Sequence, residues 1–155
     1  MEIQDVFVID RGGLPYFSKC YGGSYCQRNP DHALQTGFLA AIYSFSGEFG
    51  QKTLEIVRFE KILLVFQLIR ELDVILVFVV LASDDEPEVV EKMTAAAKIF
   101  VERYGAKISA SKIIQSDDYA PFGNDLESVL AKKPGMEIAL RRKPSLWQRI
   151  RGKWF

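Results

Sequence analysis

The hydrophobic and polar positions along the chain predict five strands. Short apolar runs over residues 5–10 and 14–21 flank Gly12 and Gly13 and predict a β-hairpin, because glycine readily adopts the positive φ of a tight turn. Further apolar runs predict three consecutive strands over residues 52–61, 62–71 and 73–82. The first of these three mixes apolar with charged residues, which suits a sheet edge, whereas the last is apolar on both faces and should lie in the centre of the sheet.

A helix is predicted between the hairpin and the three later strands. Asn29 and Pro30 favour a helix start, and Gly47 and Gly50 favour its end. In between, apolar residues recur at helical spacing at Leu34, Phe38, Ile42, Phe45 and Phe49. We therefore expect this helix to bury its phenylalanine face on the sheet.

Two further helices are predicted after the last strand. The acidic residues and the proline of segment 83–87 favour the start of a long helix, and Gly105 favours its end. Residues 107–122 follow no regular pattern. Residues 124–132 begin with a capping-box pattern and predict a short third helix.

The predicted order is β-β-α-β-β-β-α-α, which indicates an α/β fold with a five-stranded, mostly antiparallel sheet. A hairpin, one crossover helix and a meander connect the strands, and we expect helices on both faces of the sheet. A length of 155 residues suits one such domain over residues 1–133, followed by a tail over residues 134–155.

Motifs of enzyme chemistry are missing from the sequence. There is no Gly-rich loop ending in Gly-Lys-Ser/Thr, no Gly-x-Ser-x-Gly elbow and no His-Glu-x-x-His pair. The single histidine, His32, lies where the first helix should begin and has no visible partner for general-base chemistry. We therefore expect a protein that is not an enzyme and holds no cofactor or metal ion. The rival hypothesis is an acidic site built from Asp84 and Asp85 together with Asp117, Asp118 and Tyr119.

The two cysteines, Cys20 and Cys26, are predicted to be reduced thiols of a cytoplasmic protein. The chain begins with neither a basic nor an apolar leader pattern, and disulfides are rare in the cytosol. A disulfide between the two is the alternative. A zinc site that included His32 would lack a fourth ligand and the usual short ligand spacing.

The tail is strongly basic, whereas the domain is mildly acidic. Residues 134–155 contain six basic residues and one acidic residue, a net charge of +5, and residues 1–133 carry a net charge of −5. Apolar tail residues at helical spacing, combined with basic charge, are typical of a helix that lies on an anionic membrane surface. The residues predicted to bind such a surface are Arg141, Arg142, Lys143, Trp147, Arg149, Ile150, Arg151, Lys153 and Trp154. Alternatives, in decreasing order of preference, are fold-back onto the domain or partner docking, an inert tail, and nucleic-acid binding.

Three segments carry a family resemblance: Val6–Phe17, the helix around Gly37–Ile42, and the run Ile75–Val80 with the acidic helix start that follows it. Together they resemble the longin domain, of the SNARE-like, profilin-like fold, over about residues 3–132. The resemblance implies a docking module of membrane trafficking that has no enzymatic site and binds partner proteins, often small GTPases. Residues 133–155 contain no heptad-bearing helix like that of a longin SNARE, so we expect a stand-alone module. The related roadblock module also builds five strands and binds GTPases, but it usually begins with a helix.

The resulting hypothesis is a non-catalytic adaptor of membrane-trafficking or GTPase-regulation type. It would bind a protein partner, such as a small GTPase or another longin or roadblock subunit, through a sheet edge and the first helix. The predicted partner-binding residues are Phe38, Ile42, Phe45, Leu54, Ile56 and Phe59. We expect it in the cytoplasm, with its tail holding it peripherally on a membrane. The alternative is a roadblock-like homodimeric scaffold that regulates a GTPase, and a small enzyme with an acidic site ranks third.

Overall fold

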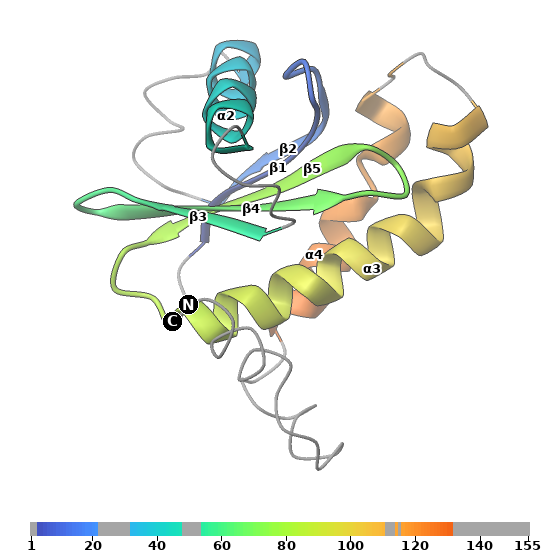
Figure 1. Ribbon diagram of the computed structural model, residues 1–155. Coiled ribbons are helices and arrows are strands. Elements are labelled where there is room, and N and C mark those ends of the chain that lie inside the picture. The colour runs from blue at the N-terminus through green and yellow to red at the C-terminus, as the bar shows by residue number, and fades with distance from the viewer. Residues whose placement is uncertain (1–2, 22–31, 48–53, 111–113, 115, 132–155) are drawn as a thin grey trace.

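The computed structural model describes residues 3–21, 32–47, 54–110, 114 and 116–131. Its elements follow the predicted order (Figure 1): β1 (Ile3–Asp10), β2 (Pro15–Cys20), α2 (His32–Gly47), β3 (Leu54–Arg58), β4 (Ile62–Ile69), β5 (Val74–Leu81), α3 (Glu86–Ala110), the 3-10 helix η1 (Ser116–Tyr119) and α4 (Phe122–Ala131).

The five strands form one antiparallel sheet in the order β2-β1-β5-β4-β3. β5 lies at its centre and is buried along all but its last residue, as its unbroken apolar sequence predicts. The register pairs Asp10 with Val74 at one end of β5, and Ile62 with Leu81 at the other end. The β1–β2 and β4–β5 turns therefore share one end of the sheet, and the β3–β4 turn lies at the opposite end.

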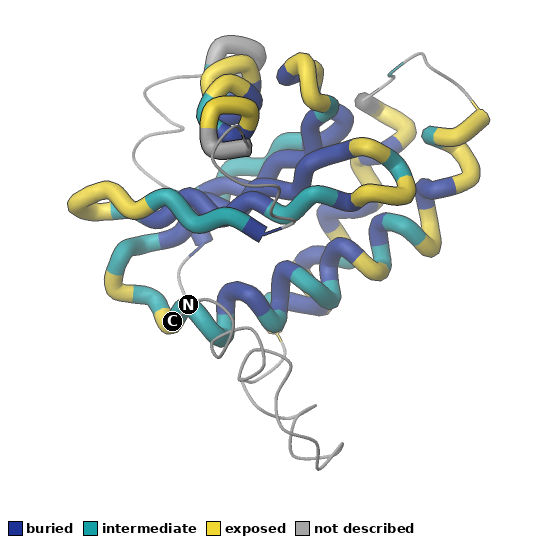
Figure 2. The backbone as a smooth tube through the Cα atoms, in the orientation of Figure 1, coloured by how far each residue is buried: buried dark blue, intermediate teal, exposed yellow. Residues whose placement is uncertain are grey.

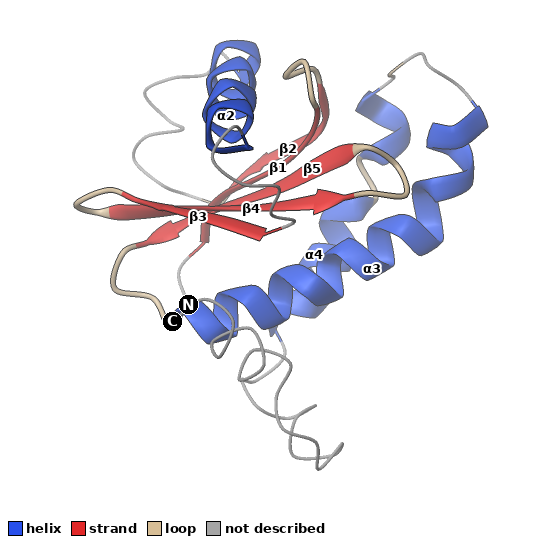
Figure 3. Cartoon of the chain, in the orientation of Figure 1, coloured by secondary structure: helices blue, strands red, loops and turns tan. Residues whose placement is uncertain are grey.

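Helices cover both faces of the sheet (Figures 1 and 3). α2 lies on one face, and α3 and α4 lie on the other. Because side chains alternate along a strand, β1 places Phe7 and Ile9 in the core beneath α2, and Val6 and Val8 in the core beneath α3. The α/β fold class expected from the sequence is confirmed.

α2 turns a different side toward the sheet from the one predicted. Phe38 is 61% exposed and Phe45 is 66% exposed, so the expectation that this phenylalanine face is buried is wrong. The buried side of α2 carries Thr36, Leu39, Ala40 and Tyr43. The Tyr43 ring packs on Phe66 of β4, with 5.9 Å between ring centroids. α2 is apolar on both sides, and helical periodicity reveals a stripe without showing which stripe meets the sheet.

α3 continues through Gly105 to Ala110, so the predicted helix stop is wrong. Gly105 is buried, and a Cβ atom there would lie 3.6 Å from Cδ2 of Leu72, in the turn between β4 and β5. Helix propensity is a weak term of about 1 kcal/mol for glycine, and packing of the helix against the sheet overrides it. Residues that were expected to be irregular therefore belong to the last turn of α3 and to η1.

Cys20, the last residue of β2, is disulfide-bonded, so the prediction of a reduced thiol is wrong at this position. The only other cysteine of the chain, Cys26, lies outside the described residues. Sequence alone could not decide between a thiol and a disulfide, because the choice depends on the distance between two cysteines in the folded chain.

Candidate interaction surface

α2 presents an uncharged, partly aromatic surface on its side away from the sheet (Figure 2). Between Gln35 and Phe45, the exposed residues are Gly37, Phe38, Ala41, Ser44 and Phe45. We call these five residues the α2 stripe. Charged and polar residues usually occupy the solvent side of a surface helix, but the α2 stripe contains no acidic or basic side chain. Exposed apolar surface that gathers in one place is a feature of protein-interaction sites.

The β1–β2 turn helps to fix the position of α2 on the sheet. Gly13 has a positive φ of 91°, and its backbone N–H donates a hydrogen bond to the carbonyl oxygen of Asp10 at 3.1 Å. The backbone of this turn lies directly against α2 at Gly37. Arg11 Nε donates to Asp73 Oδ1 at 2.5 Å and so joins the β1–β2 turn to the β4–β5 turn. The predicted hairpin with its glycine turn is confirmed.

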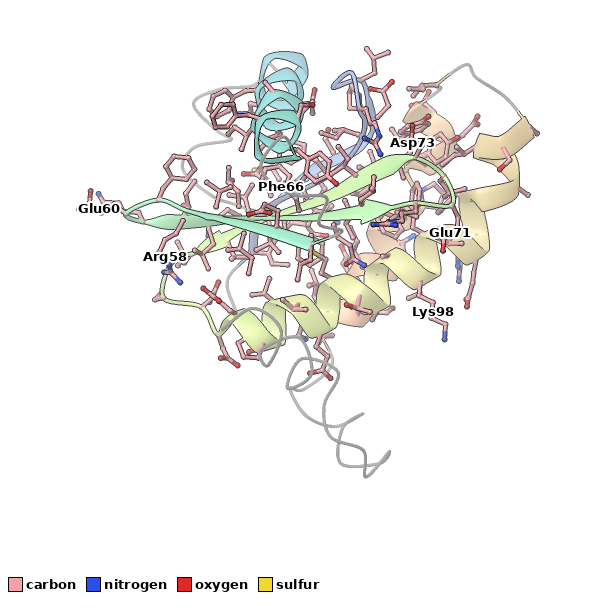
Figure 4. The ribbon with its side chains drawn as sticks, viewed as in Figure 1. Arg58, Glu60, Phe66, Glu71, Asp73 and Lys98 are labelled. Carbon is pink, nitrogen blue, oxygen red and sulfur yellow. The ribbon has the colours of Figure 1, made fainter. Side chains whose placement is uncertain are left out.

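The turn between β3 and β4 carries another exposed aromatic residue. Phe59 is 45% exposed, and its backbone N–H donates to the carbonyl oxygen of Ile62 at 2.9 Å, which closes the turn. Arg58 donates to the carbonyl oxygen of Ala82 at 3.2 Å and forms an ion pair with Glu86 at the start of α3. Figure 4 shows Arg58 at the base of this projecting hairpin. These contacts hold the hairpin to the body of the domain while Phe59 faces solvent.

The six residues predicted to bind a partner do not share one environment. Three of them are exposed, namely Phe38, Phe45 and Phe59. Two are partly buried against the cores, namely Ile42 and Ile56. Leu54 is buried in the core beneath α3, because β3 directs it to the sheet face opposite α2. The partner-binding role of all six stays a prediction, and only the three phenylalanines are well exposed.

The two edges of the sheet differ in how they are covered. Beside β2, Phe17 packs on Phe122 of α4 with 5.2 Å between ring centroids, and Lys19 Nζ donates to Glu127 Oε1 at 2.6 Å. β3 forms the other edge, and within the described part of the chain no strand pairs with its outer side. An open strand edge can accept an extended segment of a partner.

Leu14 is an exposed residue that sequence reasoning did not single out. It is 60% exposed at the β1–β2 turn, at the end of the sheet opposite Phe59. The available signal was a large apolar residue directly after a glycine turn, where a side chain has few neighbours to pack against.

The acidic residues of the rival enzyme hypothesis do not converge. Asp84 and Asp85 precede α3, whereas Asp117 and Asp118 follow it, so a helix of 25 residues, roughly 37 Å long, separates the two pairs. Tyr119 is buried instead of lining an open site. Across residues 3–21, 32–47, 54–110, 114 and 116–131, no three His, Cys, Asp or Glu residues gather as a metal site would require.

Tyr119 belongs to an aromatic cluster that joins η1 to the domain. Its ring centroid lies 5.3 Å from that of Tyr16 in β2 and 5.4 Å from that of Tyr104 in α3. Burial raises the pKa of each of these three tyrosines and has a larger effect than any neighbouring charge. The cluster therefore holds neutral phenols that pack η1 against the sheet.

The predicted membrane-binding residues, from Arg141 to Trp154, lie outside the described residues. The structure does describe the point at which the chain leaves α4. Lys92 of α3 is buried, and its Nζ donates to the carbonyl oxygens of Leu130 at 2.8 Å and Val129 at 3.3 Å. In the described part of the chain, no helix is long and apolar enough to cross a bilayer.

The fold of this chain is similar to that of several solved structures. No family model matches the chain, and no curated protein matches it. Among solved structures, the chain is similar to MglB of Myxococcus xanthus, with 14% identity and a TM-score of 0.57 over 67% of this chain and 85% of that one. It is also similar to a Roadblock/LC7 domain from Streptomyces avermitilis, with 14% identity and a TM-score of 0.52 over 67% and 86% of the two chains. A structure described as MglB with tetrameric arrangement has 16% identity and a TM-score of 0.50 over 68% and 79%.

At these identities the likeness concerns the fold alone. The chain has the longin-like fold that MglB and the Roadblock/LC7 domain share, which confirms the resemblance to longin domains at the level of the fold. One of these solved structures is a Roadblock/LC7 domain, the module that the sequence favoured less than the longin domain.

Proposed function

We propose that this chain is a non-catalytic scaffold of the GTPase-regulator type, which holds a small GTPase on its outer surface. The observation that carries the proposal is the exposure of three phenylalanines, Phe38, Phe45 and Phe59, outside a well-filled core. Large aromatic side chains contribute strongly to protein interfaces, because they bury much apolar area with few torsions to fix. The shared fold with a Roadblock/LC7 domain supports this proposal over a trafficking adaptor.

The hairpin between β3 and β4 is the proposed docking site for the GTPase. Phe59 supplies an apolar anchor there, and the ion pair of Arg58 with Glu86 holds the anchor in place. The open edge of β3 lies next to this anchor and offers backbone hydrogen-bonding groups. An anchored side chain beside an open strand edge gives a partner both apolar contact and a fixed register.

Binding titrations with the small GTPases of the same organism test this proposal. Each GTPase is loaded with GDP or with a non-hydrolysable GTP analogue and titrated with the full chain. Phe59→Asp should weaken binding by about tenfold or more, as loss of an interface anchor does. Leu14→Asp is the matched control, because it also changes an exposed apolar residue but at the opposite end of the sheet. Lack of binding to every GTPase in both nucleotide states, or equal binding by the two variants, would contradict the proposal.

Association of the tail with anionic membranes is a separate proposal that rests on its net charge of +5. Basic residues near an anionic leaflet each contribute about 1 kcal/mol. Replacing Arg141, Arg142 and Lys143 by glutamine in the full chain should reduce co-sedimentation with phosphatidylserine vesicles. Equal sedimentation of the variant and the natural chain would rule out this tether.

A further inference from the structure

The first half of α3 is covered in a way that its second half is not (Figure 2). No residue from 86 to 97 is exposed, whereas seven of the thirteen residues from 98 to 110 are exposed. Four residues follow one another along one side of the helix, at spacings of four, three and four: Glu91, Ala95, Lys98 and Glu102. Figure 4 shows that Lys98 points away from the sheet. Along this outer side, Glu91 and Ala95 are partly buried, while Lys98 and Glu102 are exposed.

The sheet does not account for the burial of this outer side. Met93 is fully buried in the core between α3 and the sheet. Glu91 and Ala95 are each two residues from Met93, which is about 200° of rotation around the helix axis, so they lie on the opposite side of α3. Their partial burial therefore indicates that a further segment of the chain covers this side.

Charge favours the tail, residues 134–155, as this segment. Residues 84–97 contain five acidic residues and one basic residue, a net charge of −4, whereas residues 98–110 contain three basic residues and one acidic residue, a net charge of +2. The tail carries a net charge of +5, so it is attracted to the first half of α3 and repelled by the second. Segments 22–31 and 48–53 each contain one basic and one acidic residue and have no such preference. The half of α3 that attracts the tail is also the half that is covered.

The chain also leaves α4 beside this surface. Lys92 Nζ donates to the carbonyl oxygen of Leu130 at 2.8 Å, so the end of α4 lies next to the second turn of α3. Glu88 is one helical turn from Lys92, about 6 Å along the axis. Residues 132–140 separate α4 from the first basic residue of the tail, Arg141, and can span about 30 Å when extended. The first half of α3 is only about 18 Å long, so the tail can reach all of it.

We propose that residues 141–154 of this chain dock on the outer side of the first half of α3. The basic run 141–143 lies against Glu88 and Glu91, and apolar residues of the tail cover Ala95. This docking does not depend on GTPase binding. It uses the same basic residues that the membrane proposal assigns to lipid, so an anionic surface has to displace the tail from α3.

Tryptophan fluorescence tests the docking, because the only two tryptophans of the chain, Trp147 and Trp154, lie in the tail. Quenching by acrylamide is measured at low salt for the natural full chain and for a double variant, Glu88→Lys with Glu91→Lys. The double variant should be quenched about twofold more strongly, because like charges then repel the tail from α3.

The matched control is a second double variant, Glu71→Lys with Glu102→Lys. It makes the same change in net charge at two exposed positions, one in the β4–β5 turn and one on the second half of α3. Its quenching should equal that of the natural chain. Equal quenching of the natural chain and the variant at Glu88 and Glu91, or an equal rise in the control, would overturn the docking.

Reversal of charge in the tail keeps the test independent of any damage to α3. Replacing Arg141, Arg142 and Lys143 by glutamate should also increase quenching. Combining these changes with Glu88→Lys and Glu91→Lys should return quenching toward that of the natural chain, because opposite charges face each other again. A combination that is quenched as strongly as either parent would overturn the proposal.

Cross-linking shows whether the tail docks on its own chain. A carbodiimide, which joins a carboxylate directly to an amine, should link Lys143 to Glu88 or Glu91. In a mixture of isotope-labelled and unlabelled chains, each linked pair of peptides should come from one chain, and pairs that join labelled to unlabelled peptides in equal number would overturn the proposal.

Co-sedimentation with phosphatidylserine vesicles separates the two proposals for the tail. A tail that is shielded from acrylamide and cross-linked to α3 but never sediments contradicts the membrane tether alone. A tail that sediments but is neither shielded nor cross-linked contradicts the docking alone.

Discussion

A Cβ atom on Gly13 would lie 2.8 Å from the Cα atom of Gly37, so the β1–β2 turn and α2 meet backbone to backbone. The same atom would lie 3.1 Å from the carbonyl oxygen of Thr36. Because backbone atoms cannot move aside as a flexible side chain can, only glycine fits at this point of the turn. The contact sets the distance between α2 and the sheet end, and thereby the placement of the α2 stripe.

Gly13→Ala should lower the free energy of unfolding by about 2–4 kcal/mol. A positive φ costs an alanine about 1–2 kcal/mol, and the forced contact with Gly37 adds an overpacking cost. Gly12→Ala is the matched control, since Gly12 is exposed in the same turn and its Cβ would meet only a side-chain oxygen of Asp10 at 3.4 Å. Urea unfolding followed by circular dichroism measures both. Equal midpoints for the two variants would show that the close contact does not constrain the turn.

The sheet and its two helical layers were predictable because each depends on an unambiguous pattern. β5 is apolar at every position, which favours a central place in the sheet with cover on both sides. The glycine pair between the two apolar runs predicted the first hairpin, and the acidic segment before Glu86 predicted the start of α3. These signals are local, and the tertiary structure agrees with them.

The candidate surface was predictable only in part, because α2 is apolar on two sides. Periodicity could not tell the side with Leu39 and Tyr43 from the side with Phe38 and Phe45. The phenylalanines made the exposed side of α2 the more hydrophobic of the two, and so predicted the wrong side for the core. The side that is buried includes Thr36 and Ala40, which are less hydrophobic. Choosing between the sides requires the close approach of Gly13 to Gly37, which joins residues that are distant in the sequence.

Phe100→Ala and Phe38→Ala should differ sharply in stability. Phe100 of α3 is fully buried in the core, so its truncation should cost about 3–5 kcal/mol. Exposed Phe38 should instead change the free energy of unfolding by less than about 0.5 kcal/mol. Thermal or urea unfolding at low protein concentration measures both without a contribution from self-association. A large cost for Phe38→Ala under these conditions would mean that its ring belongs to the core.

Lys92→Met should destabilise the domain by about 1–3 kcal/mol. The variant keeps most of the aliphatic stem but removes the ammonium group that donates to the carbonyl oxygens of Val129 and Leu130 at the end of α4. Lys98→Met is the control, because Lys98 is exposed on the same helix and should change stability by less than about 0.5 kcal/mol. Hydrogen exchange in α4 provides a second readout, and unchanged protection of its last turn would show that Lys92 does not hold it.

The buried tyrosines should leave stability unchanged near neutral pH and lower it above about pH 10. Burial raises the pKa of Tyr16, Tyr104 and Tyr119 above the ordinary value of 10.0. Below that value the phenols are neutral in both the folded and unfolded states, so they add no pH dependence. Above it the unfolded chain releases protons that the folded chain retains, and the free energy of unfolding decreases until the folded-state pKa values are passed. The decrease should follow phenolate absorbance in a pH titration, and Tyr119→Phe should make it shallower by removing one titrating group. A loss of stability well below pH 10, or an identical slope in Tyr119→Phe, would assign alkaline unfolding to other groups.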